Sequence, residues 1–321
     1  MLLRAAAPQR RGLSLVEVLA VVAIVGTLVG MMLPALGGSR ESARQIQCRS
    51  HQRQMGLAIL GFEAVHRVFP ASGWTRAGPG NPHGTAMAWR TVILPYLEED
   101  DVRTLYDPRR HWWEGTNLAV ASIPIPTYVC PSTPPQDAVT IAIAKPPRPM
   151  LALTRPLARA DHEAILGVQP ASVDPTRYGP GNRHAVIHRN STTRHAAITD
   201  GTSRTVMVVE AAGRPRVWRR GGARPDLTND QGIGWIDGEG AFSLDGAAAD
   251  GSLEGCGAAH GCPAALNARN DNEPWSFHPG GLHALFADGH ATFIHESVAL
   301  GVMAAWCTRA AGDDPLTGPA E

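Results

Sequence analysis

The feature that most constrains this chain is a stretch of 19 residues, Val18 to Leu36, without a charged side chain. A helix of about 20 apolar residues is long enough to span a bilayer. Two arginines and a glycine, Arg10 to Gly12, precede the stretch, and a single acid, Glu17, stands at its start. An unpaired carboxylate at bilayer depth is costly, so an acid at this place predicts a functional role. The sequence therefore predicts a membrane-spanning helix that is more than a plain anchor.

These residues resemble the N-terminal segment of type IV prepilins and type II secretion pseudopilins. In that family a dedicated peptidase cuts after the glycine and N-methylates the new terminal residue, and a glutamate is the fifth residue of the mature chain. The resemblance implies cleavage between Gly12 and Leu13, N-methylation of Leu13, and pairing of Glu17 with the α-amino group of a neighbouring subunit during assembly. Pro34 stands where such helices often carry a proline, whereas Leu13 replaces the usual phenylalanine.

A secretory signal peptide is the alternative interpretation of the same stretch. Its basic leader and apolar core would end in a small-x-small site at Ala35-Leu36-Gly37. Signal peptides usually have apolar regions of about 7–15 residues and no acid, which favours the prepilin interpretation. The two differ in the mature N-terminus, which is Leu13 for a prepilin and Gly38 for a signal peptide.

The pattern after the apolar stretch predicts that the helix continues from Ser39 to about Val65. Pro34 is expected to kink the helix, and Gly37-Gly38 are expected to interrupt it. One face of the continuation carries an apolar stripe that is expected to pack on a globular body, and the stripe consists of Cys48, Met55, Ile59 and Phe62.

The fold class expected from these patterns is α+β, with a long N-terminal pilin-like helix packed on an antiparallel sheet and long loops. The expected domains are a leader (residues 1–12), a transmembrane and stalk helix (13–65) and an extracytoplasmic globular domain (66–321). Asp-Gly is a strong hairpin signal between apolar alternations, and it predicts hairpins at Asp200-Gly201 and Asp288-Gly289. Short helices are expected within residues 89–106 and 297–308.

The C-terminal hairpin region carries a second signature, His278 followed after nine residues by Asp288-Gly289. This His-x9-Asp-Gly pattern resembles a large family of prepilin-like proteins, best known from Planctomycetes and catalogued as domain of unknown function 1559. The resemblance implies fold and location rather than an activity. Other stretches also agree with the family, namely Gln47-Cys48, Trp89-Arg90, Leu94 to Glu98, Cys130-Pro131-Ser132, and Asp200 to Ser203 running on to Glu210.

The histidines of this hairpin are possible metal ligands, but the expected strand register argues against a metal site. A two-residue turn pairs His283 with Ile294 and places Ala284, Phe286, Ala291 and Phe293 on one apolar face. His283 and His290 then lie roughly 13 Å apart along the strands, too far to share one ion. No metal is predicted, and His278, Asp288 and Gly289 are predicted to be structural, with the imidazole serving the loop or the Asp288 carboxylate. Metal or ligand contact by His278 is the alternative.

Five cysteines without CxxC spacing indicate neither a zinc ribbon nor a thioredoxin-like site. Cys256 and Cys262 flank a short loop that a disulfide can close, and a second disulfide can join Cys48 to Cys130. Because the number of cysteines is odd, at least one thiol is free, and Cys307 is the candidate.

No cofactor is predicted, with calcium as the alternative. Acids interleaved with glycine between Asn229 and Asp250 offer oxygen ligands, but their spacing is not that of an EF-hand. Several arginines surround Trp218 in the segment from Arg214 to Arg224. This segment is predicted to be a solvated loop. Basic and acidic residues balance at 29 each, which argues against a nucleic-acid partner.

No nucleophile motif, phosphate loop or zinc-protease motif is present, so the chain is predicted not to be an enzyme and no catalytic residue is assigned. The leading hypothesis is a structural subunit of a type IV pilus or a type II secretion-like envelope system. Its expected partners are a prepilin peptidase and methyltransferase, other pilin-like subunits and the membrane. It is expected in the cell inner membrane as a single-pass protein with its body in the periplasm or at the cell surface. The alternative is a membrane-tethered binding module that does not polymerise.

Overall fold

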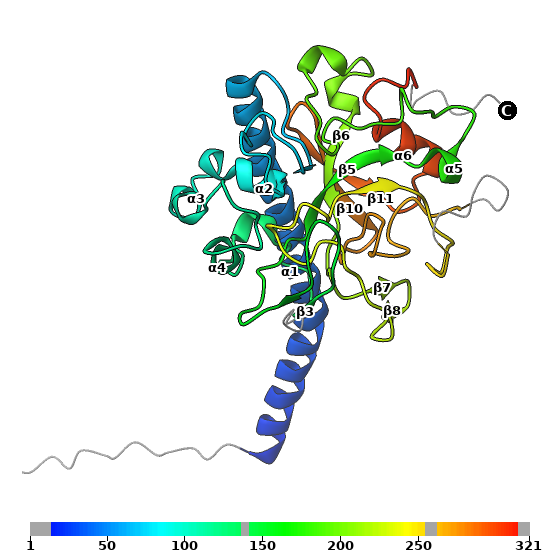
Figure 1. Cartoon of the computed structure of the whole chain (residues 1–321). Helices are drawn as coiled ribbons and strands as arrows, with labels where there is room; N and C mark the ends of the chain where they lie inside the picture. Colours follow the sequence, from blue (N-terminus) through cyan, green and yellow to red (C-terminus); the bar gives the residue numbers. More distant parts are fainter. Residues whose placement is uncertain (1–13, 136–140, 254–261, 314–321) are drawn as a thin grey trace, which may run out of the picture. The chain divides into compact units, whose positions relative to one another are not determined.

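The computed structural model describes residues 14–135, 141–253 and 262–313, with the backbone alone for residues 32–36 and 141. Within the chain, residues 1–44 form one compact unit and residues 45–321 form another (Figure 1). The predicted leader and cleavage site, Gly12 and Leu13, lie outside the described residues.

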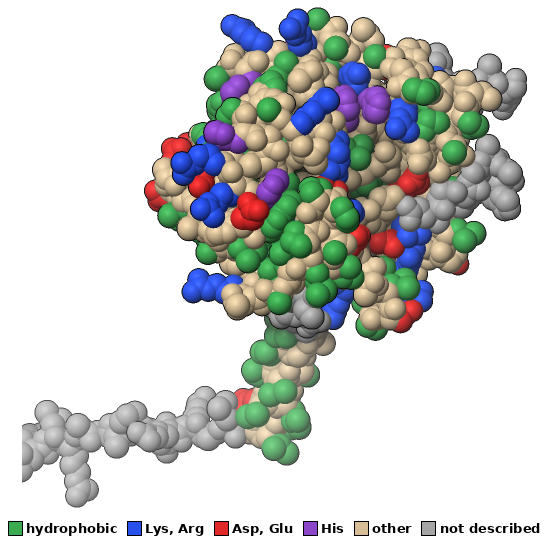
Figure 2. Space-filling view, in the orientation of Figure 1, with side chains coloured by type: hydrophobic (Ala, Val, Ile, Leu, Met, Phe, Trp, Pro, Cys, Tyr) green, Lys and Arg blue, Asp and Glu red, His purple; other side chains and the backbone are tan. Residues whose placement is uncertain are grey.

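The first element is the helix α1, Leu15–His66, which is 52 residues long. It confirms the expected N-terminal helix, and because it continues through Gly37-Gly38, the expected interruption there is wrong. In the first unit the apolar side chains of α1 are exposed, for example Leu15 at 78% and Met31 at 75%, and Figure 2 shows them in green. Among the helices in the described part of the chain, none is both long and apolar enough to cross a membrane.

A five-stranded sheet, in the order β11-β10-β6-β5-β9, is the centre of the second unit (Figure 1). Three of its four strand pairs are antiparallel, and the pair of β5 and β9 is parallel. The α+β class is therefore confirmed. The expectation of a purely antiparallel sheet is wrong at the edge of the sheet where β9 pairs with β5. The long chain between β5 and β9 makes the parallel pair possible, because parallel neighbours need a long crossover. The strands are β5 His162–Val168, β6 Val206–Glu210, β9 Phe242–Leu244, β10 Gly281–Phe286 and β11 Ala291–His295.

Each face of the sheet contributes to a separate hydrophobic core. In one core, Met55, Ile59 and Phe62 of α1 are buried together with Leu285 and Val208 of the sheet. The apolar stripe predicted on the continuation of the helix thus packs on the sheet as expected. In the other core, the opposite face of the sheet packs against α6, Leu300–Trp306, and alternate residues of β10 enter the two cores.

Short elements connect the strands. The short helices expected within residues 89–106 are α2 Trp89–Val92 and α3 Asp100–Leu105, with the 3₁₀ turn Leu94–Tyr96 between them. The hairpin expected at Asp200-Gly201 is wrong, because 3₁₀ turns flank this dipeptide and β6 pairs with β5 and β10. The remaining elements are β1 Gly73–Trp74, β2 Met87–Ala88, α4 Asn117–Val120, β3 Ile141–Ala142, β4 Leu151–Ala152, α5 Pro170–Val173, β7 Trp218–Arg219, β8 Gly222–Ala223, and 3₁₀ turns at Pro126–Tyr128, His195–Ala197 and Thr202–Arg204.

The hairpin of β10 and β11 exists, but its register differs by one residue from the expected one. His283 pairs with Phe293 rather than Ile294. The Gly289 N–H donates to the Phe286 carbonyl at 2.9 Å, and Gly289 has φ of +87°, which gives a three-residue loop with glycine in the left-handed conformation. As a result Ile294 is buried and Phe293 is partly exposed, so Phe293 does not belong to the predicted core face.

Candidate functional site

Four buried side chains with metal-ligand chemistry meet beneath α1, and we call them the buried tetrad. Their donor atoms all lie within 4.8 Å of one another, and no member is more than 2% exposed. The His278 Nε2 atom lies 3.4 Å from Cys130 Sγ and 3.2 Å from Glu210 Oε1. The members of the tetrad are Cys48, Cys130, Glu210 and His278.

Each member comes from a different part of the fold. Cys48 lies on the buried stripe of α1, and Glu210 is the last residue of β6. Cys130 follows the 3₁₀ turn Pro126–Tyr128, and its N–H donates to the buried Asp161 carboxylate at 2.9 Å. His278 lies in the loop before β10. The tetrad thus exists only when four segments far apart in the sequence are assembled.

A second layer of polar groups holds the Glu210 carboxylate in place. The His283 N–H donates to Glu210 Oε2 at 2.8 Å, and the His283 Nδ1 atom lies 3.8 Å from the same oxygen. The His283 carbonyl in turn accepts from the Gln52 amide of α1 at 2.8 Å. His162 of β5 is paired in register with Glu210, and its burial lowers the pKa of its imidazole to about 3. These contacts leave Glu210 Oε1 facing His278.

Burial and mutual contacts decide the protonation of the buried tetrad. Burial raises the pKa of the Cys48 thiol, whereas the hydrogen bond from Cys48 lowers the pKa of Cys130, assisted by His278. Burial opposes the charge of Glu210, but its bonds to His278 and His283 hold its pKa well below the usual range. Burial also opposes the charge of His278, yet its contacts with Cys130 and Glu210 raise its pKa to about 11. The tetrad therefore favours an imidazolium beside a carboxylate.

A cysteine with a lowered pKa beside a histidine also resembles a nucleophile and its base. A reactive cysteine has to be reached by its substrate, and such thiols are partly exposed. Cys130 is fully buried, so the arrangement does not favour covalent catalysis. Cys48 and Cys130 are free thiols, so the disulfide considered between them is absent.

The predicted assembly residue Glu17 takes part in a capping box at the start of α1. The Ser14 N–H donates to Glu17 Oε2 at 2.8 Å, and the Glu17 N–H donates to Ser14 Oγ at 3.3 Å. The carboxylate thus has a partner within its own helix.

The two ends of the His-x9-Asp-Gly signature do not meet. The Asp288 Oδ1 atom lies 2.6 Å from His290 Nδ1 and accepts the His290 N–H at 3.0 Å. The expectation that His278 serves the Asp288 carboxylate is therefore wrong, because His278 contacts the tetrad. Gly289 has φ of +87°, which disfavours any other residue at this turn, and a Cβ there would lie 2.9 Å from Leu60 Cδ1 of α1.

Two further predictions concern the other cysteines. Cys307 is a buried free thiol, as expected. Of the possible pair of Cys256 and Cys262, Cys256 lies outside the described residues.

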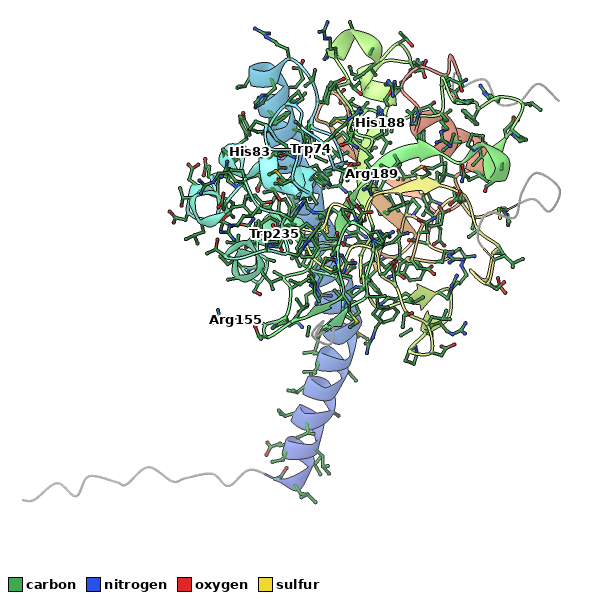
Figure 3. All side chains as sticks on the ribbon, viewed as in Figure 1. Trp74, His83, Arg155, His188, Arg189 and Trp235 are labelled. Atoms are coloured by element: carbon green, nitrogen blue, oxygen red, sulfur yellow. The ribbon has the colours of Figure 1, made fainter. Side chains whose placement is uncertain are left out.

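Three of the acids considered for calcium have partners within the protein. Glu239 forms an ion pair with Arg189 (labelled in Figure 3), Asp230 lies 3.5 Å from Lys145, and Asp250 caps the Ser252 N–H. Over the described ranges 14–135, 141–253 and 262–313, the buried tetrad is the one group of metal-ligand side chains with donor atoms this close.

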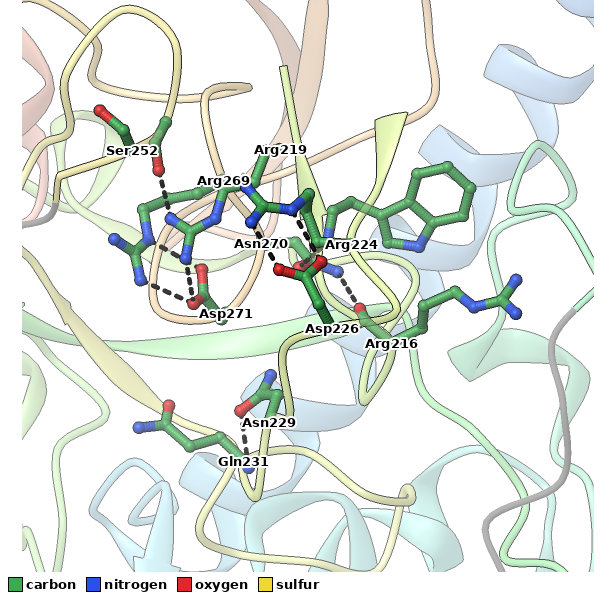
Figure 4. A network of polar contacts seen from close by, with 12 residues as sticks. Arg216, Arg219, Arg224, Asp226, Asn229, Gln231, Ser252, Arg269, Asn270 and Asp271 are labelled. Carbon is green, nitrogen blue, oxygen red and sulfur yellow. Dashed lines mark hydrogen bonds and ion pairs between the residues drawn. The ribbon is translucent and has the colours of Figure 1, made fainter. Parts of the chain in front are cut away.

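Several of the arginines around Trp218 are paired with acids, and Arg220 and Arg224 are exposed as expected for a solvated loop. Arg219 and Arg269 both contact the Asp271 carboxylate, and Arg224 pairs with Asp226 (Figure 4). Arg214, expected in a solvated loop, is fully buried, and it donates to the carbonyls of Asn270 and Gly240 at 2.7 Å.

An aromatic pocket of about 430 Å³ opens near the C-terminal end of α1. Phe62 stacks on His66 with ring centroids 4.2 Å apart and meets Tyr96 edge-on at 6.3 Å. Arg103 and Tyr106 also line the pocket, and the buried Tyr106 hydroxyl has no hydrogen-bond partner among the described residues. The pocket combines apolar walls with a few polar groups, which is typical of ligand sites.

Sequence reasoning missed Glu210 as a site residue and did not combine Cys48 and Cys130 with His278. The available signal was that all four lie in stretches quoted above for the family resemblance. Their spacings of 82, 80 and 68 residues correspond to no local metal motif, so proximity could not be read from the sequence.

The chain belongs to the protein family of unknown function defined by domain of unknown function 1559, whose model matches residues 38–301. The match spans both of the segments that carry the tetrad's outermost members, Cys48 and His278. Neither the curated proteins nor the solved structures contain a match to this chain.

Proposed function

We propose that this chain is a prepilin-like structural subunit, cut between Gly12 and Leu13 and N-methylated on Leu13. Its apolar N-terminal helix anchors it in the cell inner membrane, with the body in the periplasm or at the cell surface. Its partners are a prepilin peptidase and neighbouring pilin-like subunits of a type IV pilus or a type II secretion-like system.

The observation that carries this proposal is the exposed apolar surface of α1 in the first unit. Leu15, Val16 and Met31 are 78%, 73% and 75% exposed, and the other large apolar side chains between them are at least 46% exposed. A continuous apolar surface of this kind marks an interaction with lipid or with other apolar side chains. Neighbouring helices of the same kind, or a bilayer, would cover it.

Cleavage is tested by sequencing the mature N-terminus from the membrane fraction. We expect the mature chain to start at N-methylated Leu13. A start at Gly38 would instead identify a signal peptide and contradict the proposal.

The role of Glu17 is tested by two substitutions with different physical consequences. Glu17→Gln keeps a capping-box partner for Ser14 but removes the negative charge, whereas Glu17→Ala removes both. If Glu17 pairs with the α-amino group of a neighbour, both variants are cleaved normally and both fail to assemble. Assembly is measured by cross-linking in the native membrane, where ladders report neighbours.

A difference between the two variants in the cross-linking ladders would mean that Glu17 serves only as a helix cap. In that case Glu17→Gln gives the same ladders as the wild-type chain, and Glu17→Ala alone is impaired. Normal ladders from both variants would remove Glu17 from the proposed function altogether.

The aromatic pocket favours a second function, a membrane-tethered binding module that does not polymerise. Its volume of about 430 Å³ lies in the range of small-molecule sites. The same cross-linking experiment separates the two functions, because a tethered module gives a single monomer band where a subunit gives ladders.

A further inference from the structure

The geometry points to a structural zinc site in the body of this protein, formed by the buried tetrad of Cys48, Cys130, Glu210 and His278. This inference does not depend on whether the chain assembles into a filament.

The separations of the donor atoms fit a tetrahedral ion. Zinc binds sulfur at about 2.3 Å and nitrogen or oxygen at about 2.0–2.2 Å, so the edges of its ligand tetrahedron are about 3.3–3.8 Å. The His278 Nε2 atom is 3.4 Å from Cys130 Sγ and 3.2 Å from Glu210 Oε1. The remaining separations are at most 4.8 Å, so an ion at the centre requires only small side-chain adjustments.

Hydrogen bonding alone leaves the tetrad incompletely satisfied. A single ring nitrogen carries at most one proton, yet His278 Nε2 faces both a thiol sulfur and a carboxylate oxygen. The one proton on Nε2 can therefore serve Glu210 Oε1 at 3.2 Å or Cys130 Sγ at 3.4 Å, but not both of them well. A buried polar atom whose hydrogen bonding is incomplete is costly. A cation at the centre would contact all four donor atoms and remove this deficit.

The types of ligand and their burial indicate which metal the site takes and what it does there. Two thiolates, one imidazole and one carboxylate suit zinc, whereas calcium and magnesium prefer oxygen ligands alone. Four protein ligands without an open position define a structural rather than a catalytic site. The His283 N–H that holds Glu210 Oε2 orients the carboxylate, as second-layer groups do around zinc.

A zinc ion here would join four distant segments of the body. Cys48 comes from α1, Cys130 from the loop after Tyr128, and the other two ligands from β6 and the loop before β10. Cross-links that close long loops restrict the unfolded chain most. Zinc would therefore hold α1 residues 45–66 onto the sheet.

The test measures metal in the untagged full chain, purified in mild detergent with a reductant present. We expect roughly one zinc per chain in the wild type and at least about a tenfold loss in Cys130→Ser and His278→Ala. Cys307→Ser removes a buried free thiol outside the tetrad and is the matched control, with zinc unchanged. Removal of zinc by a chelator is expected to lower the unfolding temperature of the wild type and of this control.

A spectroscopic measurement on the wild type keeps the test independent of how the variants fold. Replacement of zinc by Co²⁺ is expected to give a thiolate-to-cobalt charge-transfer band and the strong visible bands of a tetrahedral site. A wild-type chain without metal that also fails to give these bands overturns the proposal. A disulfide between Cys48 and Cys130 in the isolated native protein overturns it as well, because oxidised sulfurs do not bind zinc.

Discussion

Arg90 is fully buried in the body, where backbone and side-chain acceptors surround its guanidinium. It donates to the carbonyls of Trp235 (labelled in Figure 3) and His162 at 2.7 and 2.8 Å, and its Nη2 lies 2.9 Å from Glu163 Oε2. Glu163 also accepts from the Trp89 indole at 3.1 Å. Because both charges are away from water, each depends on the other.

Arg90→Leu is expected to destabilise the protein by about 3–5 kcal/mol, because it leaves the Glu163 carboxylate buried without its counter-ion. Urea unfolding of the variant and the wild type measures the change. Arg109→Leu is the control, since its ion pair with Asp107 is exposed and its loss should be undetectable. Equal stability of Arg90→Leu and the wild type would show that the buried pair is dispensable.

Asp237 is a buried acid whose charge is poorly compensated. One oxygen accepts the Glu239 N–H at 3.0 Å, and Oδ2 has no hydrogen-bond partner among the described residues. Burial, with the nearby charges of Glu239 and Glu163, raises the pKa of Asp237 from 3.8 to about 6. Between these two values the folded state holds more protons than the unfolded state, so stability falls as the pH rises through this window.

Asp237→Asn is therefore expected to stabilise the protein at pH 7.5 by up to about 3 kcal/mol. The gain should shrink toward zero near pH 4, where the wild-type carboxyl is protonated. Unfolding temperatures of both proteins between pH 4 and 8 measure this convergence. A variant less stable than the wild type at pH 7.5 would mean that the carboxylate is needed by the nearby Arg148.

At the scale of elements, the contact of α1 with the hairpin of β10 and β11 depends on two glycines. A side chain on Gly56 would meet Leu285 Cδ1 at 2.8 Å and the Gly289 carbonyl at 3.0 Å. The close approach of helix and turn thus leaves little room for a side chain at position 56, whereas Gly289 is favoured by its positive φ.

Gly56→Ala is expected to destabilise the body by about 1–3 kcal/mol, because overpacking outweighs the better helix propensity of alanine. Gly38→Ala is the matched control in the same helix, since a side chain there meets nothing within 4 Å. Chemical unfolding of the two variants compares them directly. A stabilised Gly56→Ala protein would show that the helix can move away from the hairpin without loss.

The hairpin shows why local sequence patterns determine an element better than its register. Asp288-Gly289 does form the predicted turn, but glycine occupies the left-handed position of a three-residue loop. A change of one residue in loop length moves every pair, and Phe293 moves to the other face. The dipeptide itself is compatible with either loop, and the turn that forms lies against Leu60 of α1.

At the scale of the whole molecule, the two units differ in the interactions that stabilise them. The unit of residues 45–321 contains both hydrophobic cores and the buried tetrad. The described part of the unit of residues 1–44 is helix with exposed apolar side chains.

A chain that begins at Ser39 is therefore expected to fold without detergent and to keep the unfolding temperature of the full chain within about 4 °C. A chain that begins at Arg67 loses Met55, Ile59 and Phe62 from the core and is expected not to fold. Circular dichroism melts of the two truncated chains test this. A chain from Ser39 that fails to fold would show that residues 1–38 stabilise the body.

The sequence by itself determined the long N-terminal helix, the buried stripe of Cys48, Met55, Ile59 and Phe62, the α+β class and the family. These features depend on local periodicity and on short motifs, which the order of residues contains directly. Only the tertiary structure revealed the parallel edge of the sheet, the hairpin register and the meeting of the tetrad. Contacts between residues separated by 68 or more positions depend on how all the layers pack, and no local pattern encodes them.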